Sequence, residues 1–248
     1  MSKAPKDPQE IFPDIITDLK ALFANDLVSI ILYGSAARGD YVSGKSDINF
    51  MIVLSDAGID RIDQAFDMVA KWQKRNVATP LFLTEAYIDT SLDVFPIEYL
   101  NFQNNYKLVY GKDVLQHLSF DKELLRLQCE REIKGKLLVL RAGFLQSRGK
   151  GKNLQPLIAD SLGALIAIFN GLLHWKGIEL PQHHRNVIDA FCETFDMHPA
   201  LFAKLLDVRE KKVKLSESEL TDLFKDYLRE VQKLWKTVDV LHGGETPD

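Results

Sequence analysis

The sequence predicts an α+β protein, in which a mixed β-sheet with flanking helices is followed by an all-α helical bundle. Three observations predict this class. Apolar runs of strand length alternate with helical patterns up to about residue 116, and from about Leu118 long helical segments follow one another, broken by turn residues. The chain of 248 residues, 46% of them hydrophobic, is long enough for two cores. We therefore expect domains at residues 1–116 and 117–248.

In the first half, an opening helix is predicted from Asp7 or Pro8 to about Ala24, because apolar residues recur there at helical spacing. The segments 27–35 (LVSIILYGS) and 47–55 (DINFMIVLS) are predicted as buried strands. A helix over about 59–74 follows, with an inward face formed by Ile62, Phe66, Val69 and Trp72. Residues 77–84 are predicted as a third strand and residues 93–102 as a fourth, where Pro96 indicates an edge or bulged position.

The second half contains three long helical patterns, at residues 124–146, 154–177 and 219–242, and two shorter ones at 186–195 and 198–212. This succession predicts a helical bundle.

Composition excludes several classes of protein. No run of about 18 consecutive apolar residues occurs and the N-terminus is too polar for a signal peptide, so a soluble, cytoplasmic protein without a membrane partner is expected. The two cysteines, Cys129 and Cys192, support neither a disulfide framework nor a zinc site. Residues 1–116 carry 11 basic and 16 acidic side chains and residues 117–243 carry 20 and 17, which argues against binding of long nucleic acid.

Residues 39–46 (GDYVSGKS) satisfy the phosphate-loop pattern of nucleoside triphosphatases. That loop requires a helix directly after it, whereas a strand is predicted here from Asp47. The pattern is therefore not taken as a phosphate loop of this kind.

The surrounding stretch ILYGSAARGDYVSGKSDINFMIV has another interpretation. A strand leads to Gly34 and Ser35, a short helix is predicted from Ala36, and a loop then reaches Asp47 at the start of the next strand. Glycine permits close approach of a ligand, serine can donate a hydrogen bond, and a helix N-terminus attracts negative charge. Asp47 supplies an oxygen ligand of the kind that magnesium prefers.

This stretch resembles the signature of the DNA polymerase beta-like nucleotidyltransferases, in particular the small bacterial branch related to aminoglycoside nucleotidyltransferases. The matching positions are Gly34, Ser35, Ala37, Arg38, Gly39, Asp40, Ser46, Asp47 and Ile48. The resemblance covers residues 27–115 and implies a nucleotidyltransferase fold. It also implies a nucleoside triphosphate substrate held by Gly34, Ser35, Arg38 and Ser46, with Mg²⁺ as cofactor. An ion pair of Arg38 with Asp40 or another acid is the alternative role of Arg38.

The resemblance further implies three carboxylates that hold two metal ions, and this chain departs from that pattern. The second metal ligand is Asn49, whose amide oxygen can ligate magnesium but carries no charge. The predicted strand 77–84 contains no acid. Glu98 is the first candidate for the third carboxylate, as a base or a ligand, and Glu85 the second. Glu98 as a solvent-facing strand residue remains the alternative.

Two functions follow from these residues. The first is transfer of a nucleoside monophosphate to a hydroxyl of a small molecule or a protein, with Asp47, Asn49 and Glu98 as the catalytic set and Asp47 and Asn49 as metal ligands. The second is a non-catalytic nucleotide-binding or partner-binding protein of the same fold, which the amide at Asn49 favours. The acceptor is not identified by the sequence, and a homodimer is left open.

Overall fold

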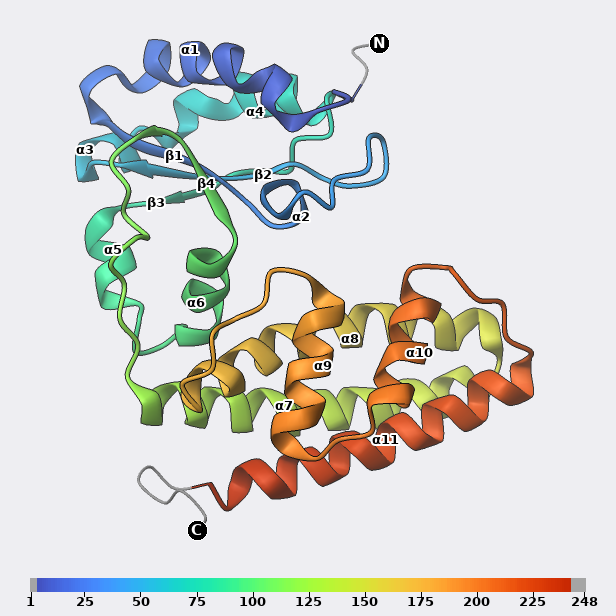
Figure 1. The fold of residues 1–248 in the computed structure, drawn as a ribbon. Helices are drawn as coiled ribbons and strands as arrows, with labels where there is room; N and C mark the ends of the chain where they lie inside the picture. The colour runs from blue at the N-terminus through green and yellow to red at the C-terminus, as the bar shows by residue number, and fades with distance from the viewer. Residues whose placement is uncertain (1–3, 242–248) are drawn as a thin grey trace. The chain divides into compact units, whose positions relative to one another are not determined.

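The computed structural model describes residues 4–241. The chain divides into two compact units (Figure 1). Residues 1–92 and 102–119 form the sheet unit, and residues 93–101 and 120–248 form the helical unit. The segment 93–101 thus belongs with the helices that follow it, although it lies before the boundary expected at residue 116.

A four-stranded mixed sheet forms the centre of the sheet unit. Its strands are β1 (Leu27–Tyr33), β2 (Asn49–Leu54), β3 (Leu81–Leu83) and β4 (Tyr106–Gly111), in the order β3-β2-β1-β4. β1 pairs antiparallel with β2 and β4, and β2 pairs parallel with β3. The predicted strands at 27–35 and 47–55 are present, whereas the third is shorter than predicted and is preceded by an isolated bridge between Ile48 and Val77.

Helices cover one face of this sheet. The chain begins with the 3-10 helix η1 (Pro8–Ile11) and α1 (Phe12–Phe23), where the predicted apolar positions Ile11, Ile15, Leu19 and Phe23 are buried. α1 and α4 (Phe66–Gln73) lie on the same side of the sheet (Figure 1). Their apolar side chains and those of alternate strand residues, Ile30, Leu32, Ile48, Phe50, Ile52 and Leu54, form one core cluster.

The prediction of one helix over 59–74 is wrong. The segment divides into α3 (Asp56–Ile59), η3 (Ile62–Ala65) and α4. These breaks change the helical phase, so Phe66 is 73% exposed and Ile62 41% exposed, while Met68 and Trp72 are buried. Of the four residues predicted to face inward, Trp72 is buried and Val69 is partly buried against the core.

The predicted strand at 93–102 is also wrong, because this segment forms α6 (Pro96–Asn104). Proline is well accommodated in the first turn of a helix, where its missing N–H is not required. The amide oxygen of the buried Gln128 accepts a hydrogen bond from the Ile97 N–H (2.8 Å). Asn101 donates to the Ala167 carbonyl (3.1 Å) and accepts from Asn170 (2.7 Å). These bonds hold the first half of α6 on the long helices, and the fourth strand is instead β4.

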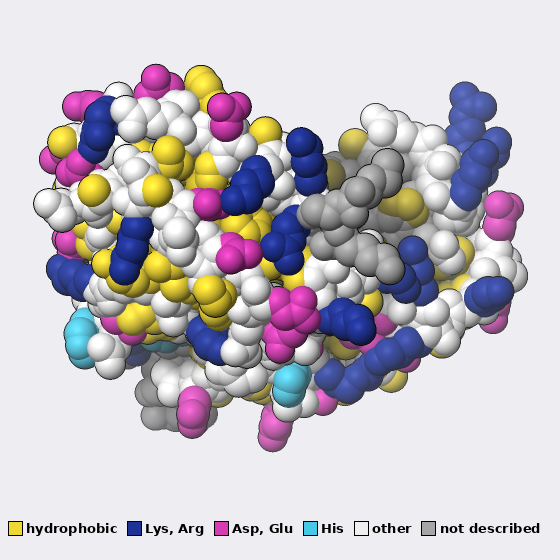
Figure 2. Space-filling model, turned by 90° about the horizontal axis from the view of Figure 1, so that it is seen from above, with side chains coloured by type: hydrophobic (Ala, Val, Ile, Leu, Met, Phe, Trp, Pro, Cys, Tyr) yellow, Lys and Arg dark blue, Asp and Glu magenta, His cyan; other side chains and the backbone are white. Residues whose placement is uncertain are grey.

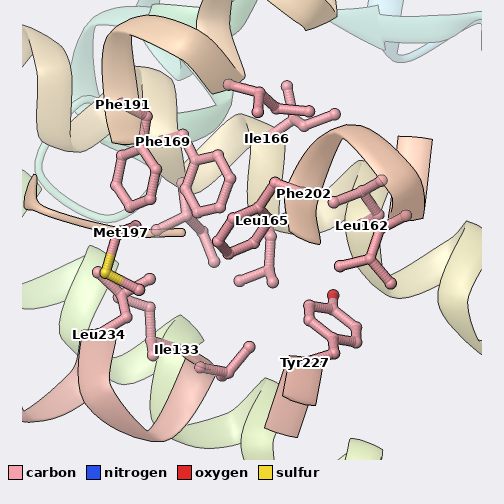
Figure 3. Packing of buried hydrophobic residues seen from close by; sticks show 14 of the residues in the cluster. Ile133, Leu162, Leu165, Ile166, Phe169, Phe191, Met197, Phe202, Tyr227 and Leu234 are labelled. Carbon is pink, nitrogen blue, oxygen red and sulfur yellow. The ribbon is translucent and has the colours of Figure 1, made fainter. Parts of the chain in front are cut away.

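The helical unit is built around α8 (Gly151–Trp175), which contacts α7 (Lys122–Ser147), α9 (His184–Phe195), α10 (Pro199–Arg209) and α11 (Glu217–Asp239). All five agree with the predicted helical patterns. Figure 3 shows their shared core, in which Phe169 stacks on Phe191 at 3.7 Å between ring centroids and Phe202 packs edge-on. The Tyr227 hydroxyl donates to Ser161 (3.2 Å) and therefore remains satisfied inside the core.

Helix α8 is also long and apolar enough to cross a membrane by length and composition. However, 61% of its most apolar window is buried in the structure. Since α8 packs against four other helices, we interpret it as the core helix of the bundle.

The face of the molecule in Figure 2 carries both basic and acidic side chains.

Candidate functional site

The candidate site lies at the end of the sheet where β1 stops and β2 begins. Tyr33, the last residue of β1, is the register partner of Asn49, the first residue of β2. Gly34 follows with φ 75° and ψ −150°, a conformation that is essentially restricted to glycine. The helix α2 (Ser35–Arg38) begins at once, and the Gly34 carbonyl accepts hydrogen bonds from Ala37 (3.1 Å) and Arg38 (3.2 Å).

Asn49 lies directly against this turn. A Cβ atom on Gly34 would be 3.3 Å from the Asn49 amide nitrogen, so the absence of a side chain at Gly34 leaves room for the amide. Ile48 is fully buried in the core below α1 and α4. Because successive strand residues point to opposite faces, Asn49 points to the other face of the sheet. Asp47 lies just before the strand.

The Asp47 side chain is exposed, and among the described residues no hydrogen bond or ion pair involves it. The two residues singled out from the sequence as metal ligands therefore lie two positions apart at the start of β2. Asn49 is within reach of the Gly34 turn, and Asp47 is open to solvent.

Two other predicted ligand residues have structural partners. Arg38 donates to the Asp40 carboxylate (3.2 Å), which is the ion pair named as its alternative role, and its side chain is only 17% exposed. The Ser46 hydroxyl accepts a hydrogen bond from the Val42 N–H (3.1 Å) and closes the turn before Asp47. After the segment 39–46 the chain continues through Asp47 into β2. A phosphate loop requires a helix at this point, and none follows it.

Two tyrosines complete the row of side chains that begins at Asn49, and the sequence analysis did not assign either to the site. Tyr33 pairs with both Asn49 and Tyr106, so all three side chains share a face of the sheet. The Tyr33 ring packs edge-on against Phe102 (4.9 Å between centroids), and burial raises the pKa of its hydroxyl. Tyr106 donates to the Asp113 carboxylate, and burial together with Asp113 raises the pKa of Tyr106 to about 12.

The expected third carboxylate has no counterpart on β3. Leu81 is the register partner of Met51, two residues beyond Asn49, and therefore points to the same face as Asn49. Glu85, at the start of α5 (Glu85–Thr90), forms an ion pair with Lys112. In the part of the chain that the structure describes, no group of three or more His, Cys, Asp or Glu side chains is arranged to hold a metal ion.

Glu98 lies on α6 and not on a strand, so its predicted setting is wrong. It belongs to the part of α6 that is assigned to the helical unit. Its carboxylate accepts a hydrogen bond from the Gln128 amide (2.7 Å). The structure thus assigns Glu98 a partner within the bundle, whereas Gly34, Asn49 and Asp47 are grouped in the sheet unit.

A cavity of about 340 Å³ lies beside α2 in the sheet unit and is lined in part by Leu32, Ala37, Tyr41, Lys6 and Lys107. Leu32 belongs to the core below α1, so this cavity is on the opposite face of the sheet from Asn49. It is therefore distinct from the row of Asn49, Tyr33 and Tyr106.

No protein-family model matches the sequence, and no curated protein does. Among solved structures, the chain is similar to the spectinomycin adenyltransferase AAD(9) from Enterococcus faecialis, which was solved with ATP and spectinomycin. The TM-score is 0.52 at 10% sequence identity, and the match covers 90% of this chain and 99% of that one. The likeness extends over both units and establishes the fold: this chain has the α+β architecture of a nucleotidyltransferase, with a mixed sheet followed by a helical region.

Proposed function

We propose that this protein binds a magnesium nucleoside triphosphate at the Gly34 turn and transfers the nucleoside monophosphate to a hydroxyl group of a small molecule or a protein. One observation carries the proposal: Asn49 begins β2 directly against the glycine-restricted turn that starts α2, and the exposed Asp47 lies two residues before it. The spectinomycin adenyltransferase of similar fold was solved with ATP and spectinomycin, a nucleotide and a small molecule.

The oxygen donors suit one magnesium ion better than two. Magnesium is commonly held by one or two carboxylates together with phosphate oxygens and water. The Asp47 carboxylate and the Asn49 amide oxygen can supply the protein ligands of one such ion. A bridge between two ions requires a carboxylate at the position of Asn49. When bound, the magnesium ion would neutralise charge on the triphosphate.

In the proposed reaction, the acceptor oxygen attacks the α-phosphorus, the bond from that phosphorus to the bridging oxygen breaks, and pyrophosphate leaves. The acceptor proton must pass to a base. Gly34 permits close approach of the triphosphate to the backbone, and Ser35 can donate its hydroxyl to a phosphate oxygen. Glu98, the first candidate from the sequence for this base, accepts a hydrogen bond from Gln128 in the structure.

The second candidate function is nucleotide or partner binding without transfer. Asn49 in place of an acid, together with Leu81 on the adjacent strand, favours it. Such a protein would keep the Gly34 turn as a ligand site and would not release pyrophosphate.

Titration calorimetry with ATP, GTP, CTP and UTP, with and without magnesium, tests both functions. We expect magnesium-dependent binding of at least one nucleotide by the wild type, which Asp47→Ala removes and Asn49→Asp strengthens. Asp60→Ala is the matched control, since it removes an aspartate near α3 in the same unit and should leave binding unchanged.

Pyrophosphate release in the presence of candidate acceptors then distinguishes transfer from binding. Binding without release for any acceptor class favours the non-catalytic function. No binding by the wild type, but binding by Asn49→Asp, would indicate a site that has lost its ligand, and absence of binding by both would refute the nucleotide site.

A further inference from the structure

The C-terminal part of α7 and the turn that follows it carry positive charge without acidic residues. Residues 133–159 contain six basic side chains and no acidic one. An even distribution of the chain's 35 acidic residues over 248 positions would place about four in these 27 positions. The acidic residues of α7, Glu123, Glu130 and Glu132, all lie before this segment. The segment therefore favours an anionic partner.

One row of side chains on α7 combines these cations with exposed leucines. We call this row the α7 ridge, and its members follow one another at steps of three or four residues, on one side of the helix: Arg131, Lys134, Leu138, Arg141, Leu145 and the C-cap residue Arg148. Leu138 is 66% exposed and Leu145 77%, and Val139 beside them is 60% exposed. Exposed fractions this large mean that the apolar side chains project from the surface and do not line a groove.

Acidic side chains compensate the charge of the ridge only at its beginning. Lys134 forms ion pairs with Glu130 (2.6 Å) and with Asp239 of α11 (2.7 Å). The Arg131 guanidinium lies 3.7 Å from the carboxylate of Glu132. These two cations are therefore the less available ones for a partner.

The other end of the ridge lacks such compensation. Arg141 donates a hydrogen bond to the neutral amide of Gln232 (2.9 Å). In the part of the chain that the structure describes, no acidic side chain pairs with Arg141 or Arg148, nor with Lys150 and Lys152, which are exposed in the turn and in the first turn of α8. The end of the ridge that carries the two leucines is thus also the end with uncompensated positive charge.

An anionic lipid surface complements this combination better than other anionic partners. Single-stranded nucleic acid is held by phosphate contacts and by stacking of bases on aromatic side chains, whereas the exposed apolar side chains of the ridge are aliphatic. A protein partner would have to offer pockets for side chains that project this far. The boundary between lipid headgroups and acyl chains accepts aliphatic side chains, and the headgroup phosphates attract arginine and lysine beside them.

We propose that the α7 ridge binds the surface of a bilayer that contains anionic lipids, with Leu138, Val139 and Leu145 inserted below the headgroups and with Arg141 and Arg148 at their phosphates. The ridge is about 26 Å long. The contact lies in the plane of the membrane surface and is reversible. The expectation of no membrane partner concerned spanning segments, and this contact requires none. It is also independent of the proposed nucleotide site.

Cosedimentation with vesicles tests the binding. The wild type should bind vesicles of phosphatidylcholine with one-third phosphatidylserine but not vesicles of phosphatidylcholine alone, and added salt should weaken the binding. Leu138→Ala with Leu145→Ala should weaken it at least about tenfold, since buried carbon atoms are lost while alanine preserves the helix. Arg141→Gln with Arg148→Gln should weaken it on the order of twentyfold at low salt.

The matched control changes one exposed apolar and one exposed basic residue elsewhere. Phe66→Ala with Lys74→Gln alters the sheet unit, where Phe66 is 73% exposed, and should bind vesicles like the wild type. Absence of binding by the wild type, as when another part of the chain or a second copy covers the ridge, would overturn the proposal. Equal binding by the wild type and both ridge variants would do the same.

A fluorescent label tests the insertion, because both native cysteines are buried. An environment-sensitive dye on Leu138→Cys should shift to shorter wavelength with anionic vesicles, whereas the same dye on Phe66→Cys should not. Binding of vesicles without this shift would contradict insertion of the leucines. Tighter binding of single-stranded RNA than of vesicles, unchanged in Leu138→Ala with Leu145→Ala, would identify a nucleic-acid surface and overturn the lipid proposal.

Discussion

At Gly34, a single backbone conformation connects the sheet to the candidate site. The φ and ψ angles place it in a region that other residues occupy only with strain, and the Asn49 amide nitrogen is 3.3 Å from where a Cβ atom would be. Gly39, which ends α2, also has a positive φ but has no neighbour within 4 Å of such a Cβ. Gly39 is therefore a glycine of positive φ without a close neighbour, and its ψ of 8° lies in the left-handed region, where a side chain costs less than in the Gly34 conformation.

We expect Gly34→Ala to lower the free energy of unfolding by about 1–3 kcal/mol, since it adds strain and displaces Asn49. The control Gly39→Ala should lose about 1 kcal/mol, from the left-handed backbone alone. Urea denaturation measures both values. Equal losses in the two variants would show that neither the backbone conformation of Gly34 nor its contact with Asn49 adds to the cost of a side chain there.

The Tyr106 hydroxyl provides a prediction about pH. Its pKa in the folded protein is about 12, above the usual value of 10, chiefly because burial disfavours the phenolate. A raised folded pKa means that the stabilisation is complete below pH 10 and is lost as pH rises from 10 towards 12. Tyr106→Phe should therefore reduce the loss of stability in this window.

Absorbance of tyrosinate as a function of pH measures the titration directly. The wild type should contain a late-titrating tyrosine that is missing from Tyr106→Phe. An unchanged late phase in Tyr106→Phe would contradict the assignment.

At the scale of elements, α6 depends on one buried amide. Gln128 accepts from the Ile97 N–H and donates to Glu98, and its side chain is 4% exposed. A buried group that loses its hydrogen-bond partner costs about 1–3 kcal/mol. We expect Gln128→Leu to destabilise the protein by this amount and to accelerate hydrogen exchange at the Ile97 amide.

The control for this prediction is Gln232→Leu, which removes an exposed hydrogen bond from Arg141 and should change stability by less than about 0.5 kcal/mol. If Gln128→Leu leaves exchange at Ile97 as slow as in the wild type, the amide does not hold the start of α6.

Two helical glycines form a second matched pair. A Cβ atom on Gly171 in α8 would be 2.8 Å from the Cys129 sulfur and 3.4 Å from Leu125, so Gly171→Ala should cost about 1–3 kcal/mol through overpacking. A Cβ atom on Gly135 in α7 has no neighbour within 4 Å, so Gly135→Ala should stabilise the protein by about 0.5–1 kcal/mol.

Thermal unfolding at low protein concentration measures both glycine variants. Cys129→Ala combined with Gly171→Ala should recover part of the loss, because the clashing sulfur is removed. Stabilisation by Gly171→Ala would show that α7 and α8 separate more easily than the packing indicates.

At the scale of the whole molecule, the chain has two core clusters that share no residue. One includes Phe50 and Trp72 in the sheet unit, and the other includes Phe169 and Phe202 in the helical unit. Phe50→Ala should remove about 3–5 kcal/mol from the sheet core. In a background with Trp175 and Trp235 replaced by Phe, Trp72 fluorescence should report a lowered midpoint for that unit.

Circular dichroism at a helical wavelength should then show a separate unfolding transition of the helical unit, and Phe50→Ala should change the midpoint of that transition little. Phe202→Ala, the equivalent change in the helical core, should shift the helical transition instead. A single transition that moves equally in both variants would indicate that the two cores unfold as one cooperative unit.

The sequence by itself determined the features that depend on neighbouring residues. Local patterns predicted the apolar runs of β1 and β2 and the helical periodicity of α1 and of the five helices of the helical unit. They also predicted the Gly34 turn with Asp47 and Asn49, so these features could be found without coordinates. Tertiary structure decided the rest. α6 is helical because Gln128 and Asn170, which are distant in sequence, satisfy its polar groups. Glu98 therefore lies on a helix and not on the predicted strand. Phe66 is exposed because two breaks before α4 change the direction in which its side chain points. Tyr33 and Tyr106 lie side by side because β1 pairs with β4. Such long-range contacts leave no periodic signal in the segments that make them.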